Sequence, residues 1–273
     1  MSSADIPTRP RALRTLDALG LAILFLLVFP PPSNASEIEG APRLESGQFE
    51  NPVGPLSHGS FGTRSFFILN RIASSFGGQE NAPERVANDG GFLRANAGSS
   101  RATVTWVGHA TLLVQMDGMS FLTDPAWTDS PSPVPGFGPR RFVEPGLTLE
   151  GLPPIDFVLV SHNHYDHLDL DTLEALARRS PETRFFVALE NAELLRSRGI
   201  TRIEELDWGD SISLGGVTVY CLPAQHWSQR GVLDRNRSLW ASWAVIGPWR
   251  RFYFAGDTGY FKGFEAIGNR LGP

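Results

Sequence analysis

Three histidines and an aspartate fall within six residues, and this stretch constrains the chain more than any other feature. It reads Ser161-His162-Asn163-His164-Tyr165-Asp166-His167-Leu168-Asp169 and follows a strand-like run, residues 155–160. Imidazole nitrogen and carboxylate oxygen suit zinc and its first-row neighbours as ligands. Bringing several imidazoles together costs free energy unless a ligand binds them. The stretch therefore predicts a metal site at the end of a strand.

The spacing within this motif predicts how its side chains divide. His162 and His164 lie two residues apart, so both can point the same way while the backbone is extended. Asp166 and His167 then come from the turn that follows, where they can face a second metal. The alternative, a set of surface or core histidines, is common for one histidine and poor for three at this spacing.

Other candidate ligands follow distant strands. His226 comes just after a predicted strand at residues 216–222, and Asp257 comes just after one at residues 251–255. A rigid scaffold builds a metal site by gathering ligands from separate parts of the chain. We therefore expect His226 to be a ligand, although a lone histidine there would be an ordinary loop residue. Asp257 could bridge two metals.

Alternating apolar residues predict a β-meander upstream of the motif. Its strands span residues 103–107, 111–116 and 119–123. Asp117-Gly118 supplies a hairpin turn between the last two strands. His109 lies at the break between the first two strands, and Asp124 lies at the end of the third. A polar residue at such a point is often a turn former, so position alone assigns neither a function.

The remaining signals alternate helix and strand. Asp169 can cap a helix that ends near Arg179, and a strand at residues 184–189 and a short helix at residues 191–198 follow. Residues 126–154 hold many prolines and glycines. A loop as long as this inside a domain is usually functional or mobile.

The first 35 residues have the pattern of an export signal. Three arginines precede an apolar run at residues 18–29, and Ser33-Asn34-Ala35 gives a small-x-small cleavage pattern. The run of 12 residues is short of the ~20 that a spanning helix needs. We expect cleavage after Ala35, with an uncleaved anchor as the alternative, and periplasmic or other extracytoplasmic placement in either case. Residues 36–100 are rich in Gly, Ser, Pro and Asn and are predicted to form an irregular arm.

Charge and cysteine content exclude other classes of protein. The net charge of -5 at pH 7 argues against a nucleic-acid partner, which usually leaves a basic footprint. The single cysteine, Cys221, excludes an internal disulfide framework and a Cys-rich zinc site. Its place in a predicted strand indicates a small buried residue.

Several short motifs together resemble the metallo-β-lactamase fold superfamily and, within it, the N-acylphosphatidylethanolamine-hydrolysing phospholipase D family. The His-x-His-x-Asp-His pattern alone marks only the superfamily, whereas its Ser-His-Asn-His-Tyr-Asp-His form and the other motifs are more selective. The resemblance extends from about Phe49 to the end of the chain. Its densest runs are Thr105 through Thr111, Leu122 through Pro125, Ser161 through Asp169, Gln225 through Ser228, Leu239 through Trp243 and Phe254 through Tyr260.

The resemblance implies a fold and a set of metal ligands. The fold would be α/β (α+β), an αββα sandwich over residues 101–273 with two zinc ions at one edge. Three histidines would hold one zinc, a carboxylate and a histidine would hold the other, and an aspartate would bridge them. The ligands of the first zinc would be His162, His164 and His226, those of the second would be Asp166 and His167, and the bridging aspartate would be Asp257.

The activity that the resemblance implies is hydrolysis of a phosphodiester. A hydroxide between the zinc ions would attack the phosphorus of an N-acylphosphatidylethanolamine, giving phosphatidic acid and an N-acylethanolamine. Asp166 and Asp257 would orient the attacking water. The position of His109, just after a strand near the site, independently suggests either a contact with a substrate oxygen or a hydrogen-bonded core histidine. A phospholipid substrate would bring the protein to a membrane surface. The late tryptophans, which either pack in the core or form a lipid-facing wall, are Trp227, Trp240, Trp243 and Trp249.

The chain departs from this family at its end. The family has a further histidine ligand, and further strands and helices, beyond the Phe254–Tyr260 run. No histidine follows His226, and the sequence stops at Pro273. We therefore expect a second zinc site without its last ligand, a sheet without its last strands, and a fragment or truncated product. The alternatives are another hydrolase of this fold, acting on a lactone or small phosphodiester, and a truncated zinc-binding protein without activity.

Overall fold

The computed structural model describes residues 38–55, 66, 86, 88–133 and 140–272. All of them belong to one compact unit, Ala35–Pro273. The predicted export signal at residues 1–35 and most of the predicted arm before residue 88 lie outside the described residues. Within the described part of the chain, no helix is long and apolar enough to cross a membrane.

The larger sheet of this unit combines a meander with a parallel half. Its strands are β1 (Thr103–Gly108), β2 (Thr111–Met116), β3 (Met119–Thr123), β4 (Phe157–Val160), β5 (Arg184–Ala188) and β6 (Ile203–Leu206), in that spatial order. β1 to β3 pair antiparallel, as the sequence predicted, and β3 to β6 pair parallel. Consequently β1, β3 and β4 all end at the same edge of the sheet.

The second sheet is antiparallel. Its strands are β7 (Ser211–Leu214), β8 (Val217–Leu222), β9 (Ser242–Ile246) and β10 (Arg251–Phe254), and the spatial order is β10-β9-β8-β7. β8 and β10 flank β9, and both run antiparallel to it. They therefore point the same way, and the segments that carry His226 and Asp257 leave the sheet at one edge.

Side chains of the two sheets form the main core between them. Alternate residues of β4 face opposite ways: Phe157 and Leu159 join this core, whereas Val158 and Val160 join a second one. All four are buried, which accounts for the continuous apolar run in the sequence. Trp243 of β9 is completely buried and reaches across to donate a hydrogen bond from its Nε1 to the Val160 carbonyl, 3.1 Å away.

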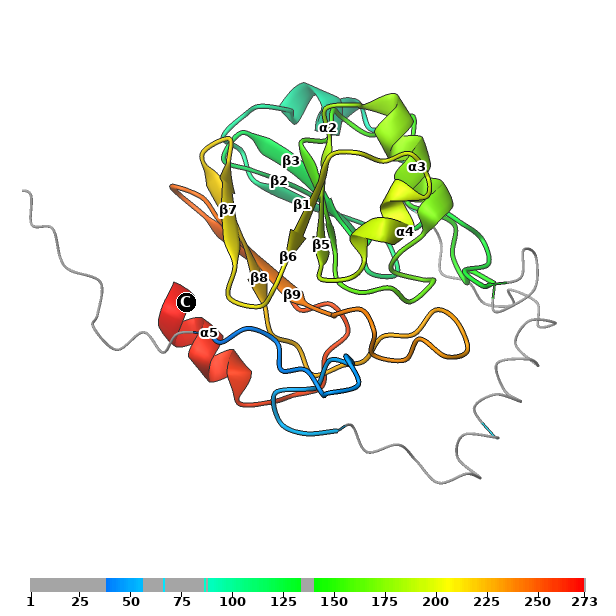
Figure 1. The fold of residues 1–273 in the computed structure, drawn as a ribbon. Coiled ribbons are helices and arrows are strands. Elements are labelled where there is room, and N and C mark those ends of the chain that lie inside the picture. Colours follow the sequence, from blue (N-terminus) through cyan, green and yellow to red (C-terminus); the bar gives the residue numbers. More distant parts are fainter. Residues whose placement is uncertain (1–37, 56–65, 67–85, 87, 134–139, 273) are drawn as a thin grey trace, which may run out of the picture. The chain divides into compact units, whose positions relative to one another are not determined.

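Helices cover the outer faces of both sheets (Figure 1). α2 (Gly91–Asn96), α3 (Leu170–Arg179) and α4 (Ala192–Arg196) pack on the larger sheet, and α5 (Gly263–Leu271) packs on the second one. α3 begins where predicted, because the Asp169 side chain accepts a hydrogen bond from the Thr172 amide. The four layers confirm the predicted αββα sandwich.

Candidate metal centre

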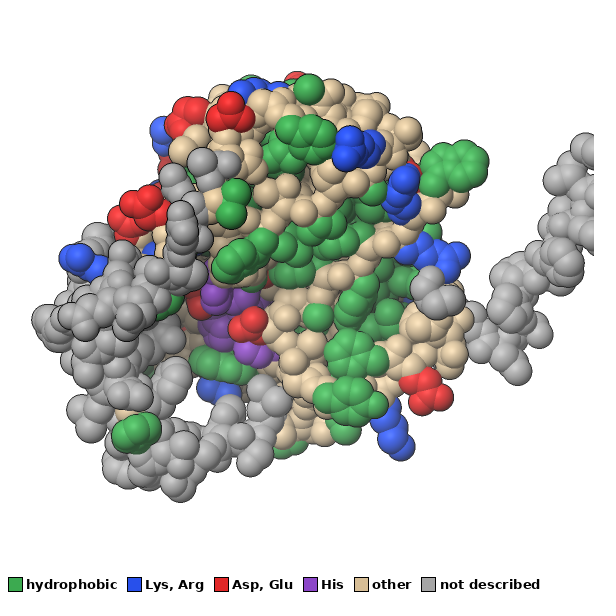
Figure 2. Space-filling view, turned by 180° about the vertical axis from the view of Figure 1, so that it is seen from behind, with side chains coloured by type: hydrophobic (Ala, Val, Ile, Leu, Met, Phe, Trp, Pro, Cys, Tyr) green, Lys and Arg blue, Asp and Glu red, His purple; other side chains and the backbone are tan. Residues whose placement is uncertain are grey.

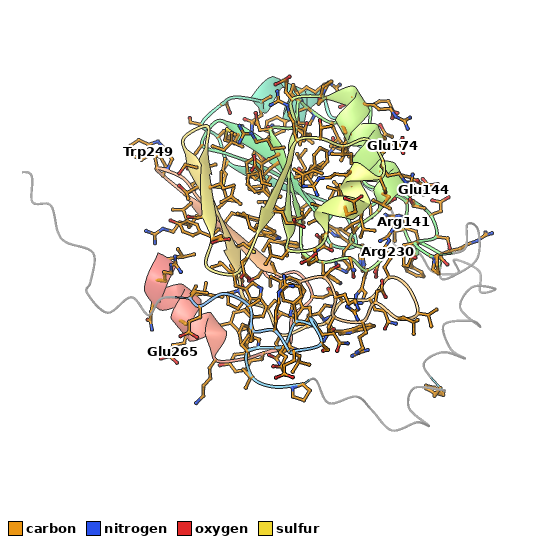
Figure 3. The ribbon with its side chains drawn as sticks, viewed as in Figure 1. Arg141, Glu144, Glu174, Arg230, Trp249 and Glu265 are labelled. Atoms are coloured by element: carbon orange, nitrogen blue, oxygen red, sulfur yellow. The ribbon has the colours of Figure 1, made fainter. Side chains whose placement is uncertain are left out.

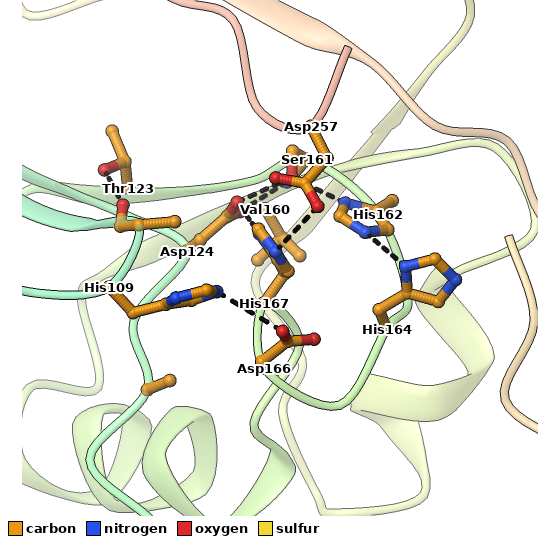
Figure 4. Close-up of polar contacts among 12 residues, drawn as sticks. His109, Thr123, Asp124, Val160, Ser161, His162, His164, Asp166, His167 and Asp257 are labelled. Atoms are coloured by element: carbon orange, nitrogen blue, oxygen red, sulfur yellow. Dashed lines mark hydrogen bonds and ion pairs between the residues drawn. The ribbon is translucent and has the colours of Figure 1, made fainter. Parts of the chain in front are cut away.

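Histidines and carboxylates from both sheets meet at one edge of the sandwich. They follow strands that end there, so sequence positions more than a hundred residues apart come together. Figure 4 labels all of them except His226 in a close-up view, and Figure 2 shows histidines gathered at the surface with an acidic side chain beside them. The residues are His109, Asp124, His162, His164, Asp166, His167, His226 and Asp257.

One group consists of His162, His164 and His226, whose candidate ligand atoms all lie within 4.8 Å of one another. The Nδ1 atom of His164 lies 2.7 Å from Nε2 of His162 and 3.4 Å from Nε2 of His226. A tetrahedral zinc with bonds of roughly 2.0–2.1 Å separates its ligand atoms by about 3.3 Å. The 3.4 Å separation matches this value and the 2.7 Å separation is shorter, so the three nitrogens converge on one point, where a cation would fit once His162 and His164 move slightly apart.

These three histidines are neutral at physiological pH. Burial lowers the pKa of His164 and of His226 to about 4, and burial together with neighbouring imidazoles takes the pKa of His162 well below its usual value. A metal binds the neutral imidazole, because protonation occupies the lone pair that the metal needs. The protonation state of the group therefore suits a cation.

A second group consists of His109, Asp166 and His167, whose candidate ligand atoms again lie within 4.8 Å. The Nε2 atom of His167 is buried without a hydrogen-bond partner, which is uncommon for such an atom. It lies 3.4 Å from Oδ2 of Asp257, and the same oxygen lies 3.9 Å from Nε2 of His226. Asp257 thus stands between the two groups, where the resemblance expected a bridging carboxylate.

A buried carboxylate that position alone did not assign supports both groups. Asp124 is fully buried, and its oxygens accept hydrogen bonds from the amide and the hydroxyl of Ser161, both at 2.6 Å, and from Nδ1 of His167 at 2.7 Å. Nδ1 of His162 lies 2.9 Å from the Ser161 hydroxyl. Because Nδ1 of each histidine is engaged, Nε2 is left to face the centre.

The charge on His167 follows from the same network. Burial lowers its pKa, but the carboxylates of Asp124 and Asp257 outweigh burial and raise the pKa to about 10. Without a bound cation the imidazole is protonated. A cation at Nε2 would take the place of that proton. The carboxylates around His167 therefore stabilise a positive charge at this position, whether it is a proton or a metal ion.

The loop that carries the motif is braced from the second half of the chain. The Arg230 guanidinium donates hydrogen bonds to the carbonyls of Asn163 and Leu168, at 3.0 and 2.8 Å, and it lies 4.0 Å above the Tyr165 ring. Figure 3 shows Arg230 on the same side of the unit as Arg141. No pattern in the sequence indicates this role, because an isolated arginine in a loop is usually solvated.

A cavity of about 700 Å³ opens beside the second group, and His109 and Asp166 form part of its wall. Its other walls include the apolar side chains of Trp106 and Phe142 and the cationic side chain of Arg141. Much of the wall comes from the long loop at residues 126–154.

The late tryptophans divide between core and surface. Trp240 and Trp243 are buried in the core, and Trp249 is 80% exposed on the side of the unit opposite Arg141 (Figure 3). Trp227 alone of the four borders the centre, with its ring 4.3 Å from the His164 ring. Core packing thus accounts for two of them, and the four do not form one wall.

Comparison with known proteins identifies the family. A profile of the Beta-lactamase superfamily domain matches residues 120–273, more than half of the chain. The chain belongs to the metallo-β-lactamase superfamily. A possible metal-dependent hydrolase of Veillonella parvula has the same fold, with a TM-score of 0.50 and 20% identity over 64% of this chain and 70% of that one.

Two curated relatives are longer than this chain. It is 45% identical to N-acyl-phosphatidylethanolamine-hydrolyzing phospholipase D 1 of Caenorhabditis elegans, over 62% of this chain and 50% of that protein. It is 49% identical to an uncharacterized protein of Mycobacterium tuberculosis, over 86% of this chain and 63% of that protein. The chain therefore spans between half and two thirds of the length of these relatives.

Proposed function

We propose that the protein is a metal-dependent phosphodiester hydrolase of the phospholipase D type. Its substrates would be lipids like N-acylphosphatidylethanolamine, which it would cleave to phosphatidic acid and an N-acylethanolamine. The observation that carries the proposal is the position of Asp257. Its Oδ2 atom lies 3.4 Å from Nε2 of His167 and 3.9 Å from Nε2 of His226. One carboxylate within reach of two ligand groups favours a pair of cations, for which we propose zinc.

The residues present suit this chemistry. Bound cations would polarise a phosphoryl oxygen and ease deprotonation of a nearby water. Asp166 and Asp257 are placed to accept hydrogen bonds from the attacking water and to orient it. Burial raises the pKa of Asp166, but His109 and His167 outweigh burial and hold that pKa below its usual range. The Asp166 carboxylate is therefore ionised and can act as an acceptor.

The cavity beside the centre supports an anionic, amphiphilic substrate. Trp106 and Phe142 offer apolar surface, and Arg140 and Arg141 supply positive charge within a wall that also holds the carboxylates of Glu144 and Asp166. A phospholipid has an acyl part that suits the first pair and a phosphate that suits the second. The C. elegans relative, named for hydrolysis of N-acylphosphatidylethanolamine, supports the same substrate class.

The proposal is tested with zinc-loaded protein and three substrates. These are a diacyl N-acylphosphatidylethanolamine in detergent micelles, an aryl phosphodiester and a lactone, each also assayed with the His162→Ala variant as control. We expect N-acylethanolamine and phosphatidic acid from the lipid, detected by mass spectrometry, and none from the variant. Turnover of the aryl ester or the lactone without turnover of the lipid would contradict the lipid assignment.

We also propose that the protein is exported and acts at a membrane surface. The support is the signal-like pattern of residues 1–35 and the lipid nature of the proposed substrate. N-terminal sequencing of the secreted protein checks this: a chain beginning near Ser36 is expected. A chain that retains Met1 and stays in the cytoplasm would contradict it.

A further inference from the structure

The β1–β2 turn brings one more histidine to the second ligand group. We propose that His109 binds the second cation through Nε2, alongside Asp166 and His167. This inference rests on the two-cation centre of the proposed function, and it replaces the substrate contact that the position of His109 after a strand led us to consider. It concerns the make-up of the centre, so metal binding can test it without an assay of hydrolysis.

The first support is a distance. Nε2 of His109 lies 3.3 Å from Oδ2 of Asp166. A hydrogen bond between a charged imidazole and a carboxylate is typically about 2.7–2.9 Å long, as it is between His167 and Asp124 at 2.7 Å. Two ligand atoms on one tetrahedral zinc are about 3.3 Å apart. The separation of His109 and Asp166 is therefore that of two atoms sharing a cation.

The second support is an internal comparison of ring geometry. In the first group the ring centroids are 4.4 to 5.2 Å apart, and the rings are close to perpendicular, at 82 to 85°. His109 and His167 have centroids 5.0 Å apart and an interplanar angle of 68°. The pair in the second group thus repeats the edge-to-face arrangement of the pairs in the first, where three imidazoles converge.

The third support is the backbone that holds His109. Its φ angle is +50°, in the left-handed region that non-glycine residues seldom adopt and that costs free energy. The carbonyl of His109 accepts a hydrogen bond from Nε1 of Trp106 at 2.9 Å, and the carbonyl of Ala110 accepts one from the Thr123 hydroxyl at 2.8 Å. The surrounding structure therefore fixes a strained turn that aims the imidazole at Asp166.

Two other roles for His109 are less consistent with these observations. A core histidine would be buried, but the His109 side chain is 49% exposed. A pure substrate contact would point Nε2 into the cavity, whereas this atom faces a carboxylate of the ligand group. The two roles also differ in effect, because removing a substrate contact leaves the bound metal unchanged.

The experiment replaces the side chain and follows the metal in the full chain. The wild type, His109→Ala and His109→Cys are loaded with Co²⁺, dialysed and analysed for cations per chain and for absorption. Thr128→Cys is the matched control, because Thr128 lines the same cavity outside the ligand group. The native thiol, Cys221, is buried in β8 and is present in every sample.

We expect two cations in the wild type and, in His109→Ala, a loss of affinity for one of them of roughly tenfold or more. His109→Cys should show a thiolate-to-cobalt charge-transfer absorption in the near ultraviolet that the wild type and Thr128→Cys lack. Unchanged affinity in His109→Ala, with no new absorption in His109→Cys, would overturn the inference and leave the proposed function standing. A wild type that holds one cation or none would overturn both.

Discussion

The carboxylate of Asp124 lies 2.7 Å from Nδ1 of His167, and both side chains are almost completely buried. A metal-binding histidine commonly donates its other ring N–H to a carboxylate, which fixes the ring and its tautomer. Here the same carboxylate also holds Ser161, whose hydroxyl lies beside Nδ1 of His162. One buried acid therefore orients a histidine in each ligand group.

Removing the charge of Asp124 is predicted to weaken metal binding. Asp124→Asn keeps the size of the side chain but gives His167 a neutral partner, so affinity for the cation held by His167 should fall roughly 10- to 100-fold. Zinc titration with a competing chelator measures this. Asp156→Asn is the matched control, because Asp156 also accepts a backbone N–H at 2.7 Å, from Ser120 at the opposite end of β3. Equal affinities in the two variants would contradict the supporting role of Asp124.

The turn before Asp257 is predicted to tolerate no side chain. Gly256 has a φ angle of +59°, and a Cβ there would lie 2.7 Å from Cβ of Ser161. Gly256→Ala should displace Asp257 or Ser161 and reduce lipid hydrolysis on the order of 100-fold. At Gly259, by contrast, a Cβ would meet nothing closer than 3.6 Å. Gly259→Ala should stay near wild-type activity, and equal losses in both variants would refute this explanation.

The packing between the sheets is predicted to depend on Trp243. Trp243→Ala should lower the free energy of unfolding by about 3–5 kcal/mol, because it empties a fully buried site. Trp243→Phe should cost about 1–3 kcal/mol, because the Val160 carbonyl loses its donor. Urea unfolding followed by circular dichroism gives both values. The exposed Trp249 is the control, and Trp249→Ala should change the free energy by no more than about 0.5 kcal/mol.

The apolar wall of the cavity is predicted to select for lipid. Phe142→Ser should raise KM for the phospholipid several-fold and leave KM for a small aryl phosphodiester unchanged, because only the lipid has an acyl chain to place there. Val104→Ser is the control, since Val104 is equally apolar and exposed but does not line the cavity. A parallel loss on both substrates would show that Phe142 acts on the centre itself.

Local patterns in the sequence predicted the parts of the fold that depend on near neighbours. The meander, the hairpin turn at Asp117-Gly118 and the Asp169 cap of α3 all follow from residues close together in the chain. Strands β6, β7 and β9 were not predicted. β6, for example, has the sequence Ile203-Glu204-Glu205-Leu206, which alternates too little to stand out before its pairing with β5 is known.

The candidate centre divides in the same way. His162, His164, Asp166 and His167 are evident because they share one short motif, and the structure brings His226 and Asp257 to them. Position alone assigns Asp124 no function, because its partner Ser161 lies 37 residues further on. Asp124 directly follows β3, and β3 pairs parallel with β4, the strand that precedes the histidine motif. This pairing brings Asp124 to Ser161, but the order of strands in a sheet cannot be read from one sequence. The cleavage site after Ala35 remains a prediction.

The central claim is that two ligand groups share Asp257 and hold two cations. The most direct measurement is the number of zinc ions per chain, by mass spectrometry of the metal, in the wild type and in His164→Ala. We predict two ions in the wild type and one in His164→Ala, because that change removes a ligand of the first group and leaves the second intact. Fewer than two ions in the wild type, or two ions still held by His164→Ala, would contradict the claim.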